Sequence, residues 1–69
     1  MRNWRAVVGG NVKRLRKERG LTQENLAQDA GIVVRYLSAI EAGRENPTVD
    51  VLGRLAAALG VHPGVLLEE

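Results

Sequence analysis

The sequence predicts an all-α, compact fold of five helices, and three observations on its 69 residues lead to this prediction. No segment shows the period-two alternation of β-branched residues that is typical of a strand. Apolar residues recur instead at the spacing of a helix. Four glycines each follow a helix-like segment, in the position where a left-handed residue commonly ends a helix. They are Gly20, Gly31, Gly43 and Gly60.

The first helix is expected from about Arg5 to Arg19, with Asn3 in the position of an N-cap. Its apolar residues follow the spacing i, i+4, i+8, i+11 and form one stripe: Trp4, Val8, Val12 and Leu15. Lys13 and Lys17 face away from that stripe. The second helix is expected to begin at Thr22, an N-cap residue, and to end at Ala30. Leu21 and Leu26 flank this start at the spacing of a hydrophobic staple.

The third helix is predicted over Val34–Ala42, with Leu37 and Ile40 turned inward. The fourth follows Pro47 and has Thr48 as its N-cap. Its expected buried residues are Val49, Leu52, Leu55, Ala56 and Leu59. A short fifth helix begins at Pro63, which suits a first helical position. Val61, Val65 and Leu66 are expected to pack it against the rest.

Length and composition narrow the possible function. A chain this short forms one domain, residues 1–69, and buries about 60% of its unfolded surface, so self-association would stabilise it. It has no cysteine, no apolar run long enough for a signal peptide or membrane span, and no motif for a metal or other cofactor. We therefore expect a cytoplasmic protein without cofactor or membrane contact.

Charge is divided unevenly along the chain. Residues 1–19 carry seven Lys and Arg against one Glu, a net +6, whereas residues 20–69 carry three against seven, a net −4. Such asymmetry indicates a patch that meets a polyanion, although a solvated helix face would give the same pattern.

The second and third helices, joined by a short turn at Gly31, fit the geometry of a helix-turn-helix unit. Ala27 is small where the two helices would nearly touch, and Gly31 supplies the positive φ of the turn. The outer face of the third helix is then left to enter a DNA groove. It carries Val33, Val34, Arg35, Ser38 and Ala39.

In this register the sequence resembles the phage repressor and Cro-type helix-turn-helix regulators, the xenobiotic-response-element family. The resemblance covers `VGGNVKRLRKERGLTQENLA`, `AG`, `YLSAIEAGRENPTVDVLGRLAAALGV` and the closing `LL`. It implies a lambda-repressor-like domain of bacterial or phage origin. The implied function is that of a DNA-binding regulator of transcription, a homodimeric repressor that reads a palindromic operator in double-stranded DNA.

The resemblance also assigns roles to particular residues. Gln23 matches a phosphate-binding glutamine at a helix N-terminus, and Arg16 and Glu41 match an internal salt bridge. The phosphate-contacting set that we expect is Thr22, Gln23, Tyr36, Arg44, Asn46 and Lys13. Relatives usually have a capping serine or threonine at the position of Val33 and a polar base-reading residue at Val34.

Two valines at these positions leave two interpretations open. They can pack on thymine methyl groups in the major groove, or they can form a small apolar contact with the protein or a partner. Arg35 is the expected specificity residue, since a guanidinium can bond bidentately to guanine O6 and N7. The alternative for Arg35 is a phosphate contact or a solvated surface position.

Other function classes fit less well. The chain has one histidine and no paired acids that require catalysis, so we do not expect an enzyme, and two aromatic residues are too few for a single-strand-binding surface. An antitoxin-like or other protein-interaction module on the same scaffold remains the alternative. A dimer is expected through Val61, Val65 and Leu67, with Trp4 as a further candidate, and no small-molecule ligand is expected.

Overall fold

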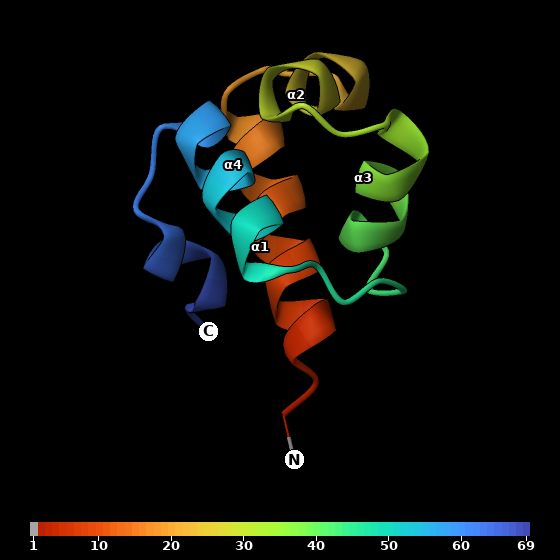
Figure 1. Cartoon of the computed structure of the whole chain (residues 1–69). Coiled ribbons are helices and arrows are strands. Elements are labelled where there is room, and N and C mark those ends of the chain that lie inside the picture. Colours follow the sequence, from red (N-terminus) through yellow and green to blue (C-terminus); the bar gives the residue numbers. More distant parts are fainter. Residues whose placement is uncertain (1) are drawn as a thin grey trace.

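The structure, a computed structural model, describes residues 2–69. Within that range it is all-α, with four α-helices and no strand (Figure 1). The fifth predicted helix is a 3-10 helix, η1, because a segment of five residues is too short for a stable α-helix. The elements in order are α1 (Trp4–Glu18), α2 (Gln23–Ala30), α3 (Val34–Glu41), α4 (Val49–Leu59) and η1 (Pro63–Leu67).

The helix ends follow the predicted capping chemistry. The side chains of Asn3, Thr22 and Thr48 accept hydrogen bonds from the backbone N–H three residues later, and His62 Nδ1 accepts from Gly64 N at 3.0 Å. All four predicted glycines have a positive φ, between 67° and 76°. The sequence prediction of where the helices stop is therefore confirmed to within one residue, since α1 ends at Glu18 instead of Arg19 and α3 at Glu41 instead of Ala42.

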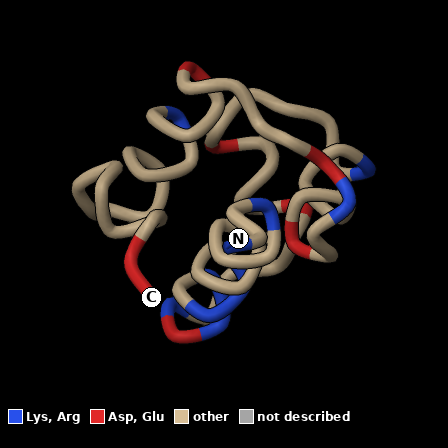
Figure 2. The backbone as a smooth tube through the Cα atoms, turned by 90° about the horizontal axis from the view of Figure 1, so that it is seen from below, with Lys and Arg blue, Asp and Glu red and all other residues tan. Residues whose placement is uncertain are grey.

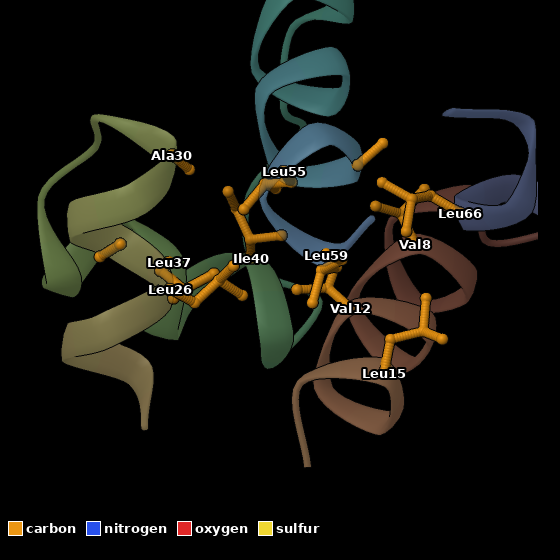
Figure 3. Packing of buried hydrophobic residues seen from close by; sticks show 12 residues of the cluster. Val8, Val12, Leu15, Leu26, Ala30, Leu37, Ile40, Leu55, Leu59 and Leu66 are labelled. Carbon is orange, nitrogen blue, oxygen red and sulfur yellow. The ribbon is translucent and has the colours of Figure 1, made fainter. Parts of the chain in front are cut away.

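One apolar core joins all five elements (Figure 3). The side chains that are fully buried include Val12 of α1, Leu26 of α2, Leu37 of α3, Leu55 of α4 and Leu66 of η1. Around them lie Val8, Leu15, Ala27, Ala30, Ile40, Ala56 and Leu59. Every element thus presents one stripe to a shared centre, as the helical spacing predicted.

Two residues assigned to buried stripes lie at the surface instead. Trp4 is 51% exposed and Val49 is 85% exposed. Each is the first residue of its helix, where the element extends past its neighbours. Helical periodicity gives the correct face at these positions, but the core does not reach them.

The arrangement leaves α3 on the outside of the molecule (Figure 1). It packs against α1 and α2, while η1 packs against α1 and α4. Gly9 allows the close approach of α1 to the end of α3, since a Cβ there would lie 2.2 Å from the Ile40 carbonyl oxygen. α3 is thereby held by α1 and α2.

Asn11, on α1, fixes the end of the chain. Its side-chain amide donates to the carbonyls of Leu66 at 2.9 Å and Glu68 at 2.7 Å. No helix within residues 2–69 is long and apolar enough to cross a membrane.

Candidate nucleic-acid interface

The turn between α2 and α3 fixes the direction of α3. Gly31 has φ 72° and ψ 34°, a left-handed conformation that costs a residue with a Cβ more than it costs glycine. Ile32 N then donates back to Ala27 O at 3.0 Å, which closes the end of α2. Val33 is extended and precedes α3 without any side-chain cap. The chain therefore turns within three residues and starts α3 at the surface.

The first turn of α3 is open to solvent. Val33 is 70% exposed, Val34 is 41% exposed, and Arg35 is also exposed. Ser38 and Ala39 are half-buried, one turn further along. The five side chains that were expected to contact bases thus include three that are exposed to solvent.

Ion pairing divides the ten basic side chains into two groups. Four arginines form ion pairs within residues 2–69: Arg2, Arg14, Arg16 and Arg54. The other six basic side chains form none in that range. They are Arg5, Lys13, Lys17, Arg19, Arg35 and Arg44. Figure 2 shows that most of the basic segments gather along α1.

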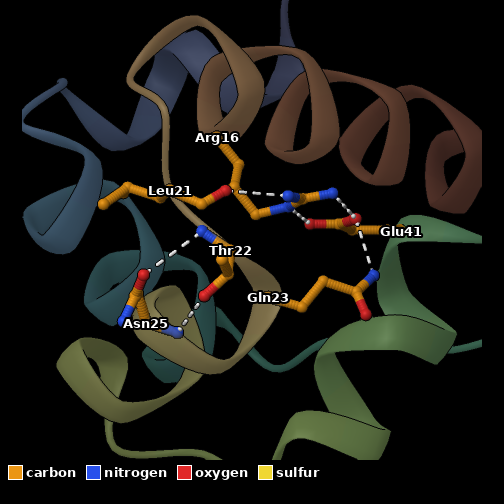
Figure 4. A network of polar contacts seen from close by, with 6 residues as sticks. All are labelled: Arg16, Leu21, Thr22, Gln23, Asn25 and Glu41. Atoms are coloured by element: carbon orange, nitrogen blue, oxygen red, sulfur yellow. Dashed lines mark hydrogen bonds and ion pairs between the residues drawn. The ribbon is translucent and has the colours of Figure 1, made fainter.

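A buried polar network joins α1, α3 and the start of α2 (Figure 4). Arg16 Nε donates to Glu41 Oε2 at 2.7 Å, and Arg16 Nη2 donates to Glu41 Oε1 at 3.1 Å. The remaining terminal nitrogen, Nη1, donates to the Leu21 carbonyl at 2.9 Å. The two side chains are only 11% and 3% exposed, so the ion pair joins α1 to α3 inside the protein.

This network keeps the Arg16 guanidinium protonated. The hydrogen bond to Glu41 raises the pKa of Arg16 above its ordinary value, against the opposing effect of burial. Within residues 2–69 no buried side-chain nitrogen or oxygen lacks a hydrogen-bond partner. The pair is therefore fully satisfied, which is the condition under which a buried ion pair can persist.

Gln23 is attached to the same network. Its Nε2 donates to Glu41 Oε1 at 3.0 Å. A carboxylate only accepts, so this bond fixes which way the amide points. The second N–H of Nε2 and the amide oxygen remain for another partner. This contact of the expected phosphate-binding glutamine was not predicted from the sequence.

The other expected phosphate contacts come from several elements: α1, the start of α2, α3 and the loop that follows α3. Lys13, Arg44 and Asn46 are exposed, and Tyr36 is half-buried against the core. Thr22 uses its hydroxyl oxygen to accept from Asn25 N at 3.0 Å. The expected dimer residues lie elsewhere, around η1: Val61 and Val65 are half-buried and Leu67 is exposed.

One feature of the surface was missed in the sequence. A shallow hollow at the start of α1 is lined by Arg2, Asn3, Trp4, Arg5 and Asn46. The only advance signal was the basic charge of the N-terminal segment, which gives no location. Within residues 2–69 no group of three or more His, Cys, Asp or Glu side chains could hold a metal ion.

Comparison with known proteins places this geometry in a family. Residues 12–66 match the helix-turn-helix family HTH_3. The uncharacterized HTH-type transcriptional regulator y4dJ of Sinorhizobium fredii is 54% identical over 57 residues, which cover 83% of this chain and 74% of the relative. The immunity repressor protein of Bacillus phage phi105 is 42% identical over 63 residues, 91% of this chain but only 44% of that repressor.

Solved structures have the same fold. The hypothetical transcription factor NHTF from Neisseria superimposes with a TM-score of 0.90 at 38% identity, covering 94% of this chain and 75% of that one. SinR, the master regulator for biofilm formation, solved in complex with DNA, superimposes with a TM-score of 0.84 at 37% identity, covering 88% and 98%. This chain therefore belongs to the HTH_3 family of helix-turn-helix transcriptional regulators.

Proposed function

We propose that this protein is a sequence-specific repressor that binds double-stranded DNA as a homodimer, a cytoplasmic regulator without enzymatic activity. The observation that carries the proposal is the exposed first turn of α3, where Val33, Val34 and Arg35 are open to solvent after the turn at Gly31. SinR, which has this fold, has been solved in complex with DNA.

In the major groove, Arg35 would donate two hydrogen bonds to guanine O6 and N7. The guanidinium has no carboxylate partner within residues 2–69, so it is available to a base. Val33 and Val34 would pack on thymine methyl groups, which apolar side chains recognise in that groove. Ser38 and Ala39 would face the next base pairs along the helix.

Phosphate contacts would position α3 without reading sequence. Gln23 has one amide N–H left after its bond to Glu41, and it lies at the start of α2, where backbone N–H groups favour an anion. Lys13 lies four residues after Gly9, on the side of α1 that faces α3. The remaining contacts in this proposal are Thr22, Tyr36, Arg44 and Asn46.

Dimerisation would use the surface around η1. Val61, Val65 and Leu67 form a small apolar set there, away from α3, which makes no extensive contact with η1. A pair of recognition helices about 34 Å apart would reach successive major grooves on one side of a palindromic site. The two-fold axis of the dimer would then coincide with that of the operator.

The test is a selection of bound duplexes from a random pool, repeated at two salt concentrations. We expect a palindromic consensus that contains guanine and thymine in each half-site, with a salt-dependent affinity because phosphate contacts release counterions. Enrichment of no sequence, with equal affinity for all duplexes, would contradict the proposal.

A further inference from the structure

The hollow at the start of α1 is not used by the proposed recognition of bases. Five residues line it: Arg2, Asn3, Trp4, Arg5 and Asn46. Of these, only Asn46 belongs to the expected phosphate-contacting set. Trp4 is half-exposed there, although helical spacing predicted it in the core.

The lining offers hydrogen-bond donors and positive charge, and it contains no carboxylate. Asn3 uses its Oδ1 to accept from Ala6 N at 3.2 Å, which leaves its NH₂ group to donate. The indole N–H of Trp4 can only donate, as can the guanidinium of Arg5. Within residues 2–69 neither side chain forms a hydrogen bond or an ion pair. This chemistry fits an anionic oxygen ligand.

Arg2 has a different part in the hollow. It pairs with Glu69, so the segment before α1 is held against the end of the chain. Half of the positive charge in the lining is thereby neutralised, and Arg5 remains as the cation without a carboxylate partner. A ligand with a single negative charge matches the single unpaired positive charge of Arg5 better than a highly charged ligand does.

The hollow lies beside the loop that joins α3 to α4. A Cβ built on Gly43 would lie 3.5 Å from Ala6 Cα, so the loop passes directly over the first turns of α1. Asn46, in the same loop, is shared by the hollow and by the expected phosphate-contacting set. An anion in the hollow would therefore sit next to a phosphate held by Arg44 and Asn46.

We propose that this hollow binds a backbone phosphate of the DNA, adjacent to the one held by the loop, through Arg5, Trp4 and the amide of Asn3. The inference rests on the proposed function and extends the DNA footprint beyond α2, α3 and their following loop. Each phosphate carries one negative charge, in agreement with the single unpaired arginine of the hollow.

Trp4 reports on the hollow directly, because it is the only tryptophan in the chain. The experiment measures quenching of its fluorescence by acrylamide, in the full chain with and without a saturating duplex. We expect the duplex to lower the quenching constant at least twofold, and inorganic phosphate at the same ionic strength to leave it unchanged. Unchanged quenching under conditions where anisotropy reports full binding would overturn the inference, and protection by inorganic phosphate alone would identify a general anion site in place of a DNA contact.

Salt dependence supplies a second readout. Arg5→Ala should lower the slope of log affinity against log salt by about 0.9, the value of one phosphate contact. Arg14→Ala is the matched control, because it also removes one positive charge from α1. The two residues are nine positions apart, about two and a half turns, and so project from opposite sides of the helix. Arg14 lies next to Asn11, which faces η1.

The two outcomes of failure are distinct. A wild-type chain that binds no duplex contradicts the proposed function together with this inference. A wild-type chain that binds normally, with Arg5→Ala and Arg14→Ala giving the same slope, contradicts the inference alone. Because Arg5 is exposed, the thermal melt of Arg5→Ala should match that of the wild type.

Discussion

Removing the Glu41 carboxylate should destabilise the protein more than any change at its surface. Glu41→Ala deletes three hydrogen bonds at once: those from Arg16 Nε, Arg16 Nη2 and Gln23 Nε2. Arg16 then keeps only the Leu21 carbonyl, with its side chain 11% exposed. An arginine left buried without its partner costs about 3–5 kcal/mol.

That cost is large for a chain of this size. At about 0.05–0.15 kcal/mol per residue, 69 residues give a free energy of unfolding of about 3–10 kcal/mol. Glu41→Ala should therefore remove a large part of the free energy of unfolding, about half of it at mid-range values. Equilibrium urea denaturation followed by circular dichroism measures the change, and the midpoint should fall with little change in slope.

Glu18→Ala is the matched control. It removes a carboxylate that also pairs with an arginine, Arg14, at 3.3 Å, but both side chains are half-exposed. Such a surface pair within one helix contributes about 0.3–0.5 kcal/mol. Glu41→Ala should therefore lose more free energy of unfolding than Glu18→Ala. A difference of less than about 1 kcal/mol between the two losses would contradict the assignment of Arg16 and Glu41 as a buried ion pair.

A double replacement separates the unpaired charge from the loss of packing. Arg16→Met combined with Glu41→Leu removes both charges and keeps the apolar volume, so most of the stability should return. The raised pKa of Arg16 means that its contribution is fully present below the unfolded pKa of arginine and is lost only as pH rises through the higher folded value. The part of the stability loss in Glu41→Ala that comes from the unpaired charge of Arg16 should therefore be the same throughout the neutral pH range.

Three further predictions concern packing, recognition and assembly. Gly10→Ala should stabilise the fold by up to about 1 kcal/mol because its Cβ would meet nothing within 4 Å, whereas Gly9→Ala should lower the melting temperature because its Cβ would strike the Ile40 carbonyl. Replacing the contacted thymine of the operator by uracil should lower the affinity of the wild type about fourfold, the value of one buried methyl group. The same replacement should leave the affinity of Val34→Ala unchanged, and an equal loss in both proteins would argue against a methyl contact. Leu67→Lys should shift the sedimentation equilibrium toward monomer with an unchanged melt of the monomer, and an unaltered dimer would move the interface elsewhere.

Local chemistry made the helix boundaries predictable. Thr22 and Thr48 cap the helices that they were expected to cap, and Gly31 and Gly60 end helices in the left-handed conformation. These signals involve residues at most a few positions apart, so the sequence displays them directly. The core followed from helical spacing for the same reason.

Features that depend on distant parts of the chain were less predictable. Trp4 and Val49 have the right helical phase but lie where their helices extend beyond the core. The pairing of Arg16 with Glu41 spans 25 positions and was expected only through the family resemblance. Neither the bond from Gln23 to Glu41 nor the hollow beside Asn46 follows from any local pattern, because each requires two or three elements to be placed in space.

The function of the exposed first turn of α3 is tested most directly by the sequence preference of Arg35→Ala. The measurement is the ratio of its affinity for the selected operator to its affinity for random duplex, at two salt concentrations, beside the wild type. We predict that this ratio falls by about 5- to 150-fold, the equivalent of about 1–3 kcal/mol, with little change in the salt slope. Equal weakening on operator and random DNA, with a smaller salt slope, would show that Arg35 contacts phosphate and would contradict base reading by this turn.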